Sequence, residues 1–299
     1  MESVEKNKKM EALVSLIDEP EPEVFRDIST NILQFGTDII PVLEDAWETH
    51  HLPEVQDRIV SIIHQIQFGQ VCKDLEDWII SDSDNLLNGC IIIARYHYPE
   101  LEEEQIRYDI SRLRKDIWME LNENLTALEQ IKVFNHVFYK IHGFSGNVAN
   151  YHDPRNSYIN KVLELKTGNP LSLGILYLIL AQSLEIPVQG INLPEHFVLA
   201  YTGNTLNPDT LELSKDNVLF YINAFSKGAV FSFKDIEVFL KQINMKPLPQ
   251  YYMPCSNHQI IIRMLNNLSI AYSKESQKGK SEEINFLNQI IKKHLDDKV

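Results

Sequence analysis

The sequence predicts an α+β protein, with helices in its first part and a small antiparallel sheet later in the chain. Two observations carry this prediction. Residues 170–184 are apolar on nearly every side, as in a helix buried at the centre of a domain, and segments 196–201 and 218–224 alternate as strands do. A buried helix followed by two neighbouring strands indicates a helix packed on a sheet.

The first part of the chain contains a weak sequence repeat. Apolar residues keep helical spacing up to about residue 124, the motif Pro22-Glu23-Val24 recurs 31 positions later as Pro53-Glu54-Val55, and Trp47 recurs as Trp78. A period of this size predicts stacked helix pairs of the HEAT type. We expect each proline to open a helix, because a first-turn residue needs no partner for an N–H group.

Capping residues predict where the later helices begin. Thr126 and Glu129 form a capping-box pattern, and Asn169-Pro170 supplies an N-cap and a first-turn proline for the apolar helix. The remaining elements are expected in this order: a turn-rich excursion at 202–209, a helix capped by Ser232 and ending near 243, and two helices within 257–295 on either side of the polar stretch 273–280.

Composition argues against several classes of function. The formal net charge of −14 disfavours nucleic acid as a partner, because phosphate binding depends on lysine and arginine. No run approaches the ~20 apolar residues of a membrane span, and the polar start of the chain does not resemble a signal peptide. We therefore expect a cytoplasmic protein with no membrane partner.

Cysteine and histidine positions do not predict a metal or cofactor site. Cys72, Cys90 and Cys255 lack metal or redox spacing and are interpreted as reduced thiols. The pair His50-His51 and His97 have no carboxylate or thiol at ligand spacing. The sequence thus predicts neither a metal nor another cofactor.

Five motifs occur in an order that resembles one known family. They read Asn150-Tyr151-His152-Asp153, Gly168-Asn169-Pro170-Leu171-Ser172-Leu173, Ile186-Pro187, Pro194-Glu195-His196-Phe197 and Tyr221-Ile222-Asn223-Ala224-Phe225, and Arg263-Met264-Leu265-Asn266-Asn267-Leu268 continues the likeness. Together they resemble the SirB family of bacterial proteins over residues 126–295. The resemblance implies a transglutaminase-like (papain-like) core at 126–245, preceded by a HEAT-like repeat domain at 1–125 and followed by a tetratricopeptide-like helical hairpin at 246–299.

The resemblance also implies where catalytic residues would lie. Transglutaminases carry a nucleophilic cysteine seventeen residues before a Gly-Ile-Pro proline, and counting back from Pro187 reaches Pro170, which cannot be a nucleophile. His196 falls on the position of the catalytic histidine. Alternation along the strand puts His196, Val198 and Ala200 on one face, and we expect the imidazole to lie beside the start of the 170–184 helix. Asn223 stands where the family carries aspartate, so it could orient an imidazole but not stabilise its charge. We expect a hydrogen bond between His196 and Asn223.

Two functions remain open. The first is a non-catalytic, pseudoenzyme-like protein that binds a protein or peptide partner through its helical repeats. The second is an acyl-transfer enzyme or an amide or peptide hydrolase that uses His196 with Asn223 and Ser172. Ser172 would have to point into the cleft, although it lies ~200° around the helix from the usual site and a first-turn serine more often caps free N–H groups. The sequence does not predict the oligomeric state.

Overall fold

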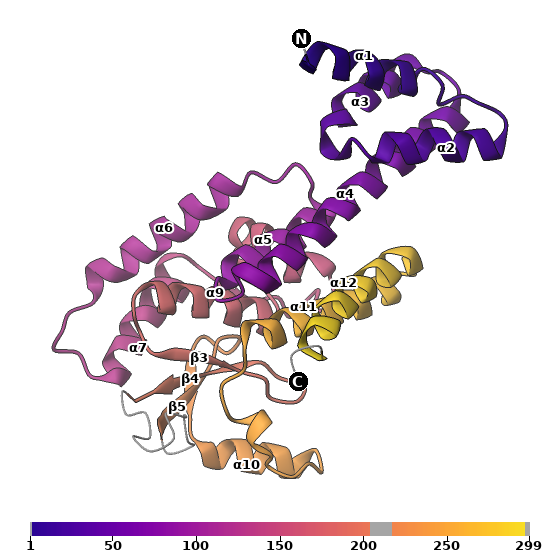
Figure 1. Cartoon of the computed structure of the whole chain (residues 1–299). Coiled ribbons are helices and arrows are strands. Elements are labelled where there is room, and N and C mark those ends of the chain that lie inside the picture. The colour runs from indigo at the N-terminus through magenta and orange to yellow at the C-terminus, as the bar shows by residue number, and fades with distance from the viewer. Residues whose placement is uncertain (1, 204–216, 297–299) are drawn as a thin grey trace. The chain divides into compact units, whose positions relative to one another are not determined.

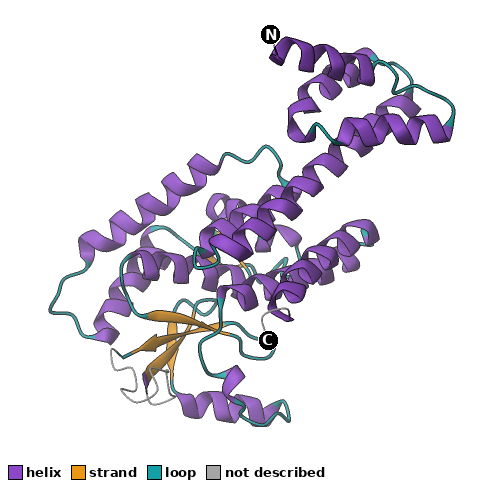
Figure 2. Cartoon of the chain, viewed as in Figure 1, coloured by secondary structure: helices purple, strands orange, loops and turns teal. Residues whose placement is uncertain are grey.

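The computed structural model describes residues 2–203 and 217–296 (Figure 1). The chain divides after Glu76 into two compact units, Met1–Glu76 and Asp77–Val299. Figure 2 shows that strands occur only in the second unit of the described chain. The α+β class predicted from the sequence is confirmed, and so is the helical character of the first part.

The first unit is built from helices around an isoleucine-rich core. Its elements are α1 (Glu2–Val14), α2 (Pro22–Leu33), the 3-10 turn η1 (Gly36–Ile39), α3 (Ile40–Thr49) and most of α4 (Pro53–Ser81). Ile32, Leu43 and Ile59 are fully buried in this core. As predicted, α2 and α4 both begin at a proline, where the missing N–H group leaves no hydrogen bond unmade.

The two copies of the repeat fold differently. After Phe35, Gly36 takes a φ of +60° and interrupts the helical path, so the first copy is a helix pair. In the second copy the pair Phe35-Gly36 recurs as Phe68-Gly69, 33 positions later. This pair lies inside α4, which continues unbroken for 29 residues. A glycine permits a left-handed turn but does not impose one, and the second copy is therefore a single long helix.

The second unit surrounds one buried helix, α9 (Pro170–Ser183), whose residues Leu171 to Ala181 are all buried. The other helices are α5 (Leu86–His97), α6 (Glu103–Glu120), α7 (Ala127–Asn135) with a π-helical continuation (His136–Ile141), α8 (Ile159–Leu165), α10 (Phe233–Gln242), α11 (Asn257–Lys274) and α12 (Lys278–Asp296). The predicted capping box of Thr126 forms, and Ser232 caps α10 as predicted, also with a capping box.

A four-stranded antiparallel sheet lies between α9 and α10 (Figure 1). Its strands are β3 (Val188–Ile191), β4 (Val198–Thr202), β5 (Val218–Asn223) and β6 (Ala229–Phe231), in that order. Phe197 packs on Gly174 of α9, whereas Val198 and Ala200 pack with Ile236 of α10. The predicted pairing of segments 196–201 and 218–224 is confirmed, although β4 begins at Val198. Most of the predicted excursion at 202–209 lies outside the described residues.

Two very short parallel strands bring a loop to the start of α9. These are β1 (Ser145–Gly146) and β2 (Thr167–Gly168), and the backbone N–H of Asn147 donates to the carbonyl of Gly168. The loop from Asn147 to Ser157 therefore starts beside the N-terminus of the buried helix.

The C-terminal pair of helices is confirmed, with the break between α11 and α12 falling inside the polar stretch. Its likeness to a tetratricopeptide hairpin stays a prediction, as does the three-part division of the chain. Within the ranges 2–203 and 217–296, no helix is long and apolar enough to cross a membrane.

Candidate functional site

The N-terminus of α9 is closed by its own capping residues. Asn169 Oδ1 accepts from the backbone N–H of Ser172 at 2.9 Å, and Ser172 Oγ accepts from the backbone N–H of Asn169 at 3.0 Å. Pro170 occupies the first helical position and is only partly buried. The place at which the family resemblance expects a thiol thus holds a side chain without reactive atoms.

Ser172 is occupied by this capping role. Its side chain is buried, with the residue 2% exposed, and Oγ donates to the carbonyl of Asn169 at 3.3 Å. A Cβ placed on Gly168 would lie 2.5 Å from Ser172 Oγ, so the hydroxyl points at β2. The structure does not bring Ser172 to His196.

His196 lies on the face of the sheet that α10 covers. It shares the phase of Val198 and Ala200, and its exposed ring meets Phe239 of α10 edge-on with a centroid distance of 5.1 Å. The sequence predicts instead that this ring sits beside the start of α9. His196, Val198 and Ala200 do share one face of the strand, as predicted. The opposite face, which includes Phe197, is the one that packs on α9.

Asn223 lies at the end of β5, on the same face as His196. Because Tyr221 pairs with Ala200, Asn223 is in phase with the α10 side of the sheet. Its Oδ1 accepts from the backbone N–H of Ser226 at 3.1 Å and so fixes the turn into β6. No hydrogen bond joins His196 to Asn223 in the part of the chain that the structure describes. The expected bond is therefore not formed, and the catalytic roles of both residues stay predictions.

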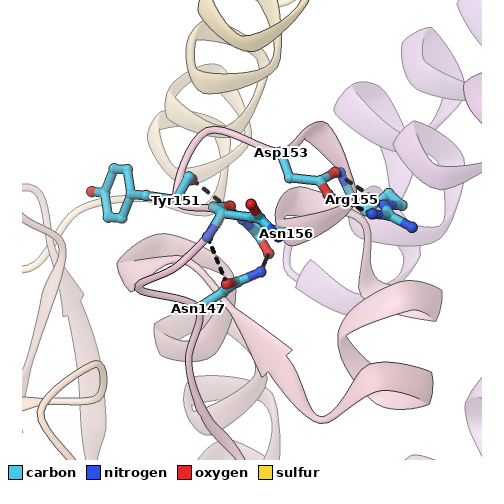
Figure 3. A network of polar contacts seen from close by, with 6 residues as sticks. Asn147, Tyr151, Asp153, Arg155 and Asn156 are labelled. Atoms are coloured by element: carbon cyan, nitrogen blue, oxygen red, sulfur yellow. Dashed lines mark hydrogen bonds and ion pairs between the residues drawn. The ribbon is translucent and has the colours of Figure 1, made fainter.

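A polar network beside α9 was not predicted from the sequence (Figure 3). Asn147 Nδ2 donates to Asn156 Oδ1 at 2.9 Å, and Asn156 Nδ2 donates to the carbonyls of Asn150 and Tyr151 at 2.6 and 3.2 Å. Asn156 is only 3% exposed. An asparagine side chain can hydrogen-bond to loop carbonyls and to N–H groups at once. Three asparagines within ten residues are therefore the feature of the sequence that could have predicted this network.

The network continues through the short helix at Pro154–Ser157 to the cap of α9. Asp153 accepts from Arg155 through both Nε and Nη2, the latter at 2.7 Å, and these hydrogen bonds lower the pKa of the Asp153 carboxyl. Asn169 Nδ2 donates to Ser157 Oγ at 3.0 Å. Ser157 and Asn169 are both buried, so the loop is fastened to the helix cap by buried amide and hydroxyl groups.

Neither Cys90 nor Cys255 is an activated thiol. Burial raises the pKa of the Cys90 thiol, and it raises the pKa of Cys255 to about 11. Cys255 Sγ donates to the carbonyl of Gly190 at 3.2 Å. Among the described residues, no three or more His, Cys, Asp or Glu side chains are grouped as metal ligands.

Comparison with known proteins places the second unit in a family. A model of the transglutaminase-like superfamily matches residues 104–266. The UPF0162 protein of Xylella fastidiosa strain 9a5c is 27% identical over 199 residues, which are 64% of this chain and 66% of that protein. The UPF0162 protein of Vibrio cholerae is 29% identical over 66% of this chain and 69% of its own length.

A eukaryotic protein is also similar. F-box only protein 21 of Homo sapiens is 30% identical over 231 residues, which are 77% of this chain but 34% of that protein. The chain thus spans slightly less than two thirds of the Xylella relative and about a third of the human one. No solved structure gives a significant match. The family model covers more than half of the 299 residues, and the chain belongs to the transglutaminase-like superfamily.

Proposed function

We propose that this protein is a transglutaminase-like pseudoenzyme of the SirB type, which acts by binding at the N-terminus of α9 and not by acyl transfer. The observation that carries the proposal is Pro170 at the first position of that helix. A thiolate at this position would gain from the helix dipole, and a proline ring offers neither a nucleophile nor a proton. The similarity to UPF0162 proteins supports the assignment to the SirB type.

The arrangement of the other predicted residues supports the same proposal. Covalent catalysis needs a nucleophile and a base within hydrogen-bond reach of each other. Ser172 is buried on the α9 side of the sheet, while His196 is exposed on the α10 side. The alternative of an amide-hydrolysing enzyme would require both to turn toward one cleft.

The proposal is tested by assaying the whole chain with p-nitrophenyl esters, glutamine-containing peptides and amine acceptors. We expect no turnover above that of heat-denatured protein, in the wild type and in Ser172→Ala and His196→Ala. Ser172→Ala should still lose about 1 kcal/mol of unfolding free energy, because the capping box is removed. Turnover that His196→Ala abolishes would overturn the proposal.

The proposal also includes a second binding surface, a cellular location and a repeat type. Exposed apolar side chains such as Trp47 and Leu52 on the helical first unit support binding of a protein or peptide there. Three free thiols fit a cytoplasmic location, and the α11–α12 pair fits a tetratricopeptide-like hairpin. Thiol-directed reagents are not expected to abolish any activity of the core, because no cysteine lies within 126–245.

A further inference from the structure

A cavity of about 160 Å³ lies where the 151–157 loop, the cap of α9 and α11 meet. Ser157, Asn169 and Asn267 contribute polar groups to its wall, and Ile270 and Ala271 of α11 contribute apolar ones. Such a volume has room for several water molecules or for one small polar molecule. The cavity belongs to the polar network of Figure 3, because Tyr151 and Asp153 also line it.

The Ser157 hydroxyl is buried at the cavity wall, and its O–H group donates no hydrogen bond to the described protein residues. The residue is 4% exposed, and Oγ accepts from Asn169 Nδ2. No acceptor for its own O–H group occurs among the described residues. A buried hydroxyl normally donates as well as accepts, so this geometry calls for an acceptor inside the cavity.

Asn267 adds a second set of free donors. Its carboxamide lines the cavity from α11 and makes no hydrogen bond within the described parts of the chain. Of the nearby ionic groups, Arg155 pairs with Asp153, whereas Lys274 Nζ donates to an imidazole nitrogen, His152 Nε2, at 2.9 Å. The polar groups of the cavity wall without a protein partner thus include two kinds of donor, the Ser157 O–H and the Asn267 N–H groups.

Arg263 supplies an unmatched positive charge next to these donors. It precedes Asn267 by one helical turn, so the two side chains emerge about 5–6 Å apart on one face of α11. Arg263 Nη1 donates to Asn192 Oδ1 and to the carbonyl of Leu193, both neutral acceptors. Burial lowers the pKa of this guanidinium, and only Cys255 and Tyr151 act in the opposite direction.

A half-buried guanidinium without a carboxylate partner among the described residues is costly for a folded protein. Its remaining N–H groups, from Nε and Nη2, can bind a carboxylate through two parallel hydrogen bonds. Tyr151 lines the cavity and also lies close enough to Arg263 to affect its pKa. Arg263 itself does not line the cavity, but it lies one turn of α11 from Asn267, which does.

We propose that this cavity, together with Arg263 one helical turn from its wall, binds a small carboxylate of amino-acid size, either a free molecule or an acidic side chain of a peptide. Arg263 neutralises the carboxylate, and Ser157 and Asn267 donate to its oxygens. This inference rests on the proposed binding function, since it names the ligand class of the site at the start of α9.

The experiment is a titration of the isotopically labelled whole chain, followed by two-dimensional ¹H–¹⁵N NMR. The probes are L-glutamate, acetyl-L-glutamate N-methylamide as a peptide-like carboxylate, and L-glutamine as a neutral match of nearly equal shape. We expect shifts of the Asn267 carboxamide signals with at least one glutamate probe, and about ten-fold weaker binding of glutamine. The stronger of the two glutamate probes identifies the source of the carboxylate.

Variants separate the cavity from a general charge effect. Arg263→Met should weaken glutamate binding about ten-fold or more and leave glutamine binding unchanged, with Arg263→Lys intermediate. Ser157→Ala and Asn267→Ala should each weaken it about three- to ten-fold. Ser226→Ala, an exposed serine at another turn, is the matched control and should bind as the wild type does.

Three results would overturn the inference: no shift with either glutamate probe, equal binding of glutamine, or unchanged binding in both Ser157→Ala and Asn267→Ala. If Arg263→Met does not fold, the last two variants still decide the question. Failure here is distinguishable from failure of the proposed function, because the latter appears as His196-dependent turnover and needs no glutamate.

Discussion

Gly228 lies in the turn between β5 and β6, at a position where a side chain would meet two obstacles. Its φ is +71°, and an added Cβ would lie 2.0 Å from Asn135 Oδ1. The Asn135 carboxamide is held in place, because Nδ2 donates to the carbonyl of Gly228 and Oδ1 accepts from Tyr177 Oη. The turn that carries Asn223 is thereby fastened to the end of α7.

Gly228→Ala is expected to lower the unfolding free energy by about 3 kcal/mol or more, because it adds backbone strain and displaces the half-buried Asn135 from its hydrogen bonds. Gly143→Ala is the matched control: its φ is +74°, but nothing lies within 4 Å of the new Cβ. That variant should lose only the ~1–2 kcal/mol of backbone strain. Urea unfolding measures both, and equal losses would mean that Asn135 moves aside without cost.

Pro170→Cys tests the residue that carries the proposed function. A thiol at the first position of α9 should have a pKa below the ordinary ~8.5, because the helix N-terminus favours the thiolate. We expect it to react with iodoacetamide faster than free cysteine near neutral pH, and faster than the native thiols. Since His196 lies on the other face of the sheet, adding His196→Ala should leave this rate unchanged. A fall in rate would show that the imidazole reaches the helix.

At the scale of elements, a chain of aromatic groups joins α11 to α5 and to the residue before α8. Tyr158 Oη and Tyr272 Oη are hydrogen-bonded at 2.6 Å, and Tyr272 Oη is also hydrogen-bonded to His97 Nδ1 at 3.2 Å. The His97 ring also stacks on the Tyr158 ring with an interplanar angle of 10°. Burial and the charge of Lys280 lower the pKa of His97, so this arrangement suits the neutral imidazole.

This contact predicts a pH dependence of stability. The pKa of His97 in the folded protein is below its unfolded value of about 6.5. The contribution of His97 to the unfolding free energy is therefore fully present above pH ~6.5 and is lost as the pH falls toward the folded pKa. In His97→Asn, an amide oxygen can still accept from Tyr272 but does not titrate. We expect this variant to lose less unfolding free energy than the wild type between pH 7 and pH 5.

Urea unfolding at the two pH values measures the difference. The pKa of His142 is also lowered, chiefly by burial, and this residue is present in both proteins, so some pH dependence remains in the variant. Identical slopes for wild type and His97→Asn would contradict the assignment to His97.

The elements that the sequence predicted well are those set by local interactions. The caps at Thr126, Asn169 and Ser232 depend on residues within three positions, and each forms. The surroundings of His196 depend on which helix covers which face of the sheet. Alternation along a strand predicts that two residues share a face but not what packs on it, so the contact with α10 was not predictable from this pattern.

At the scale of the whole molecule, the candidate site brings together residues far apart in the sequence. Ser157 precedes α8, Asn169 caps α9, and Asn267 lies on α11. The contact that positions the loop is a pair of two-residue parallel strands, too short for any period to reveal. The order of motifs predicted the family, but the cavity follows only from the packing of α11 on the loop and the cap.

The division into two units predicts separable stability. Ile59 lies in the core of the first unit and Leu265 in the second, and both are fully buried. Truncation of either to alanine should cost ~2–5 kcal/mol, because it leaves a cavity. If each unit opens independently, Ile59→Ala should speed amide hydrogen exchange by at least ~30-fold within 1–76 and leave 77–299 unchanged.

Leu265→Ala is the reciprocal variant and should speed exchange in 77–299 alone. The helix α4 runs across the boundary, so its residues 77–81 are the place where coupling would first be visible. Since the family model matches only residues 104–266, glutamate binding should also survive Ile59→Ala with less than a two-fold change. Faster exchange throughout the chain in either variant would mean that the two units unfold as one.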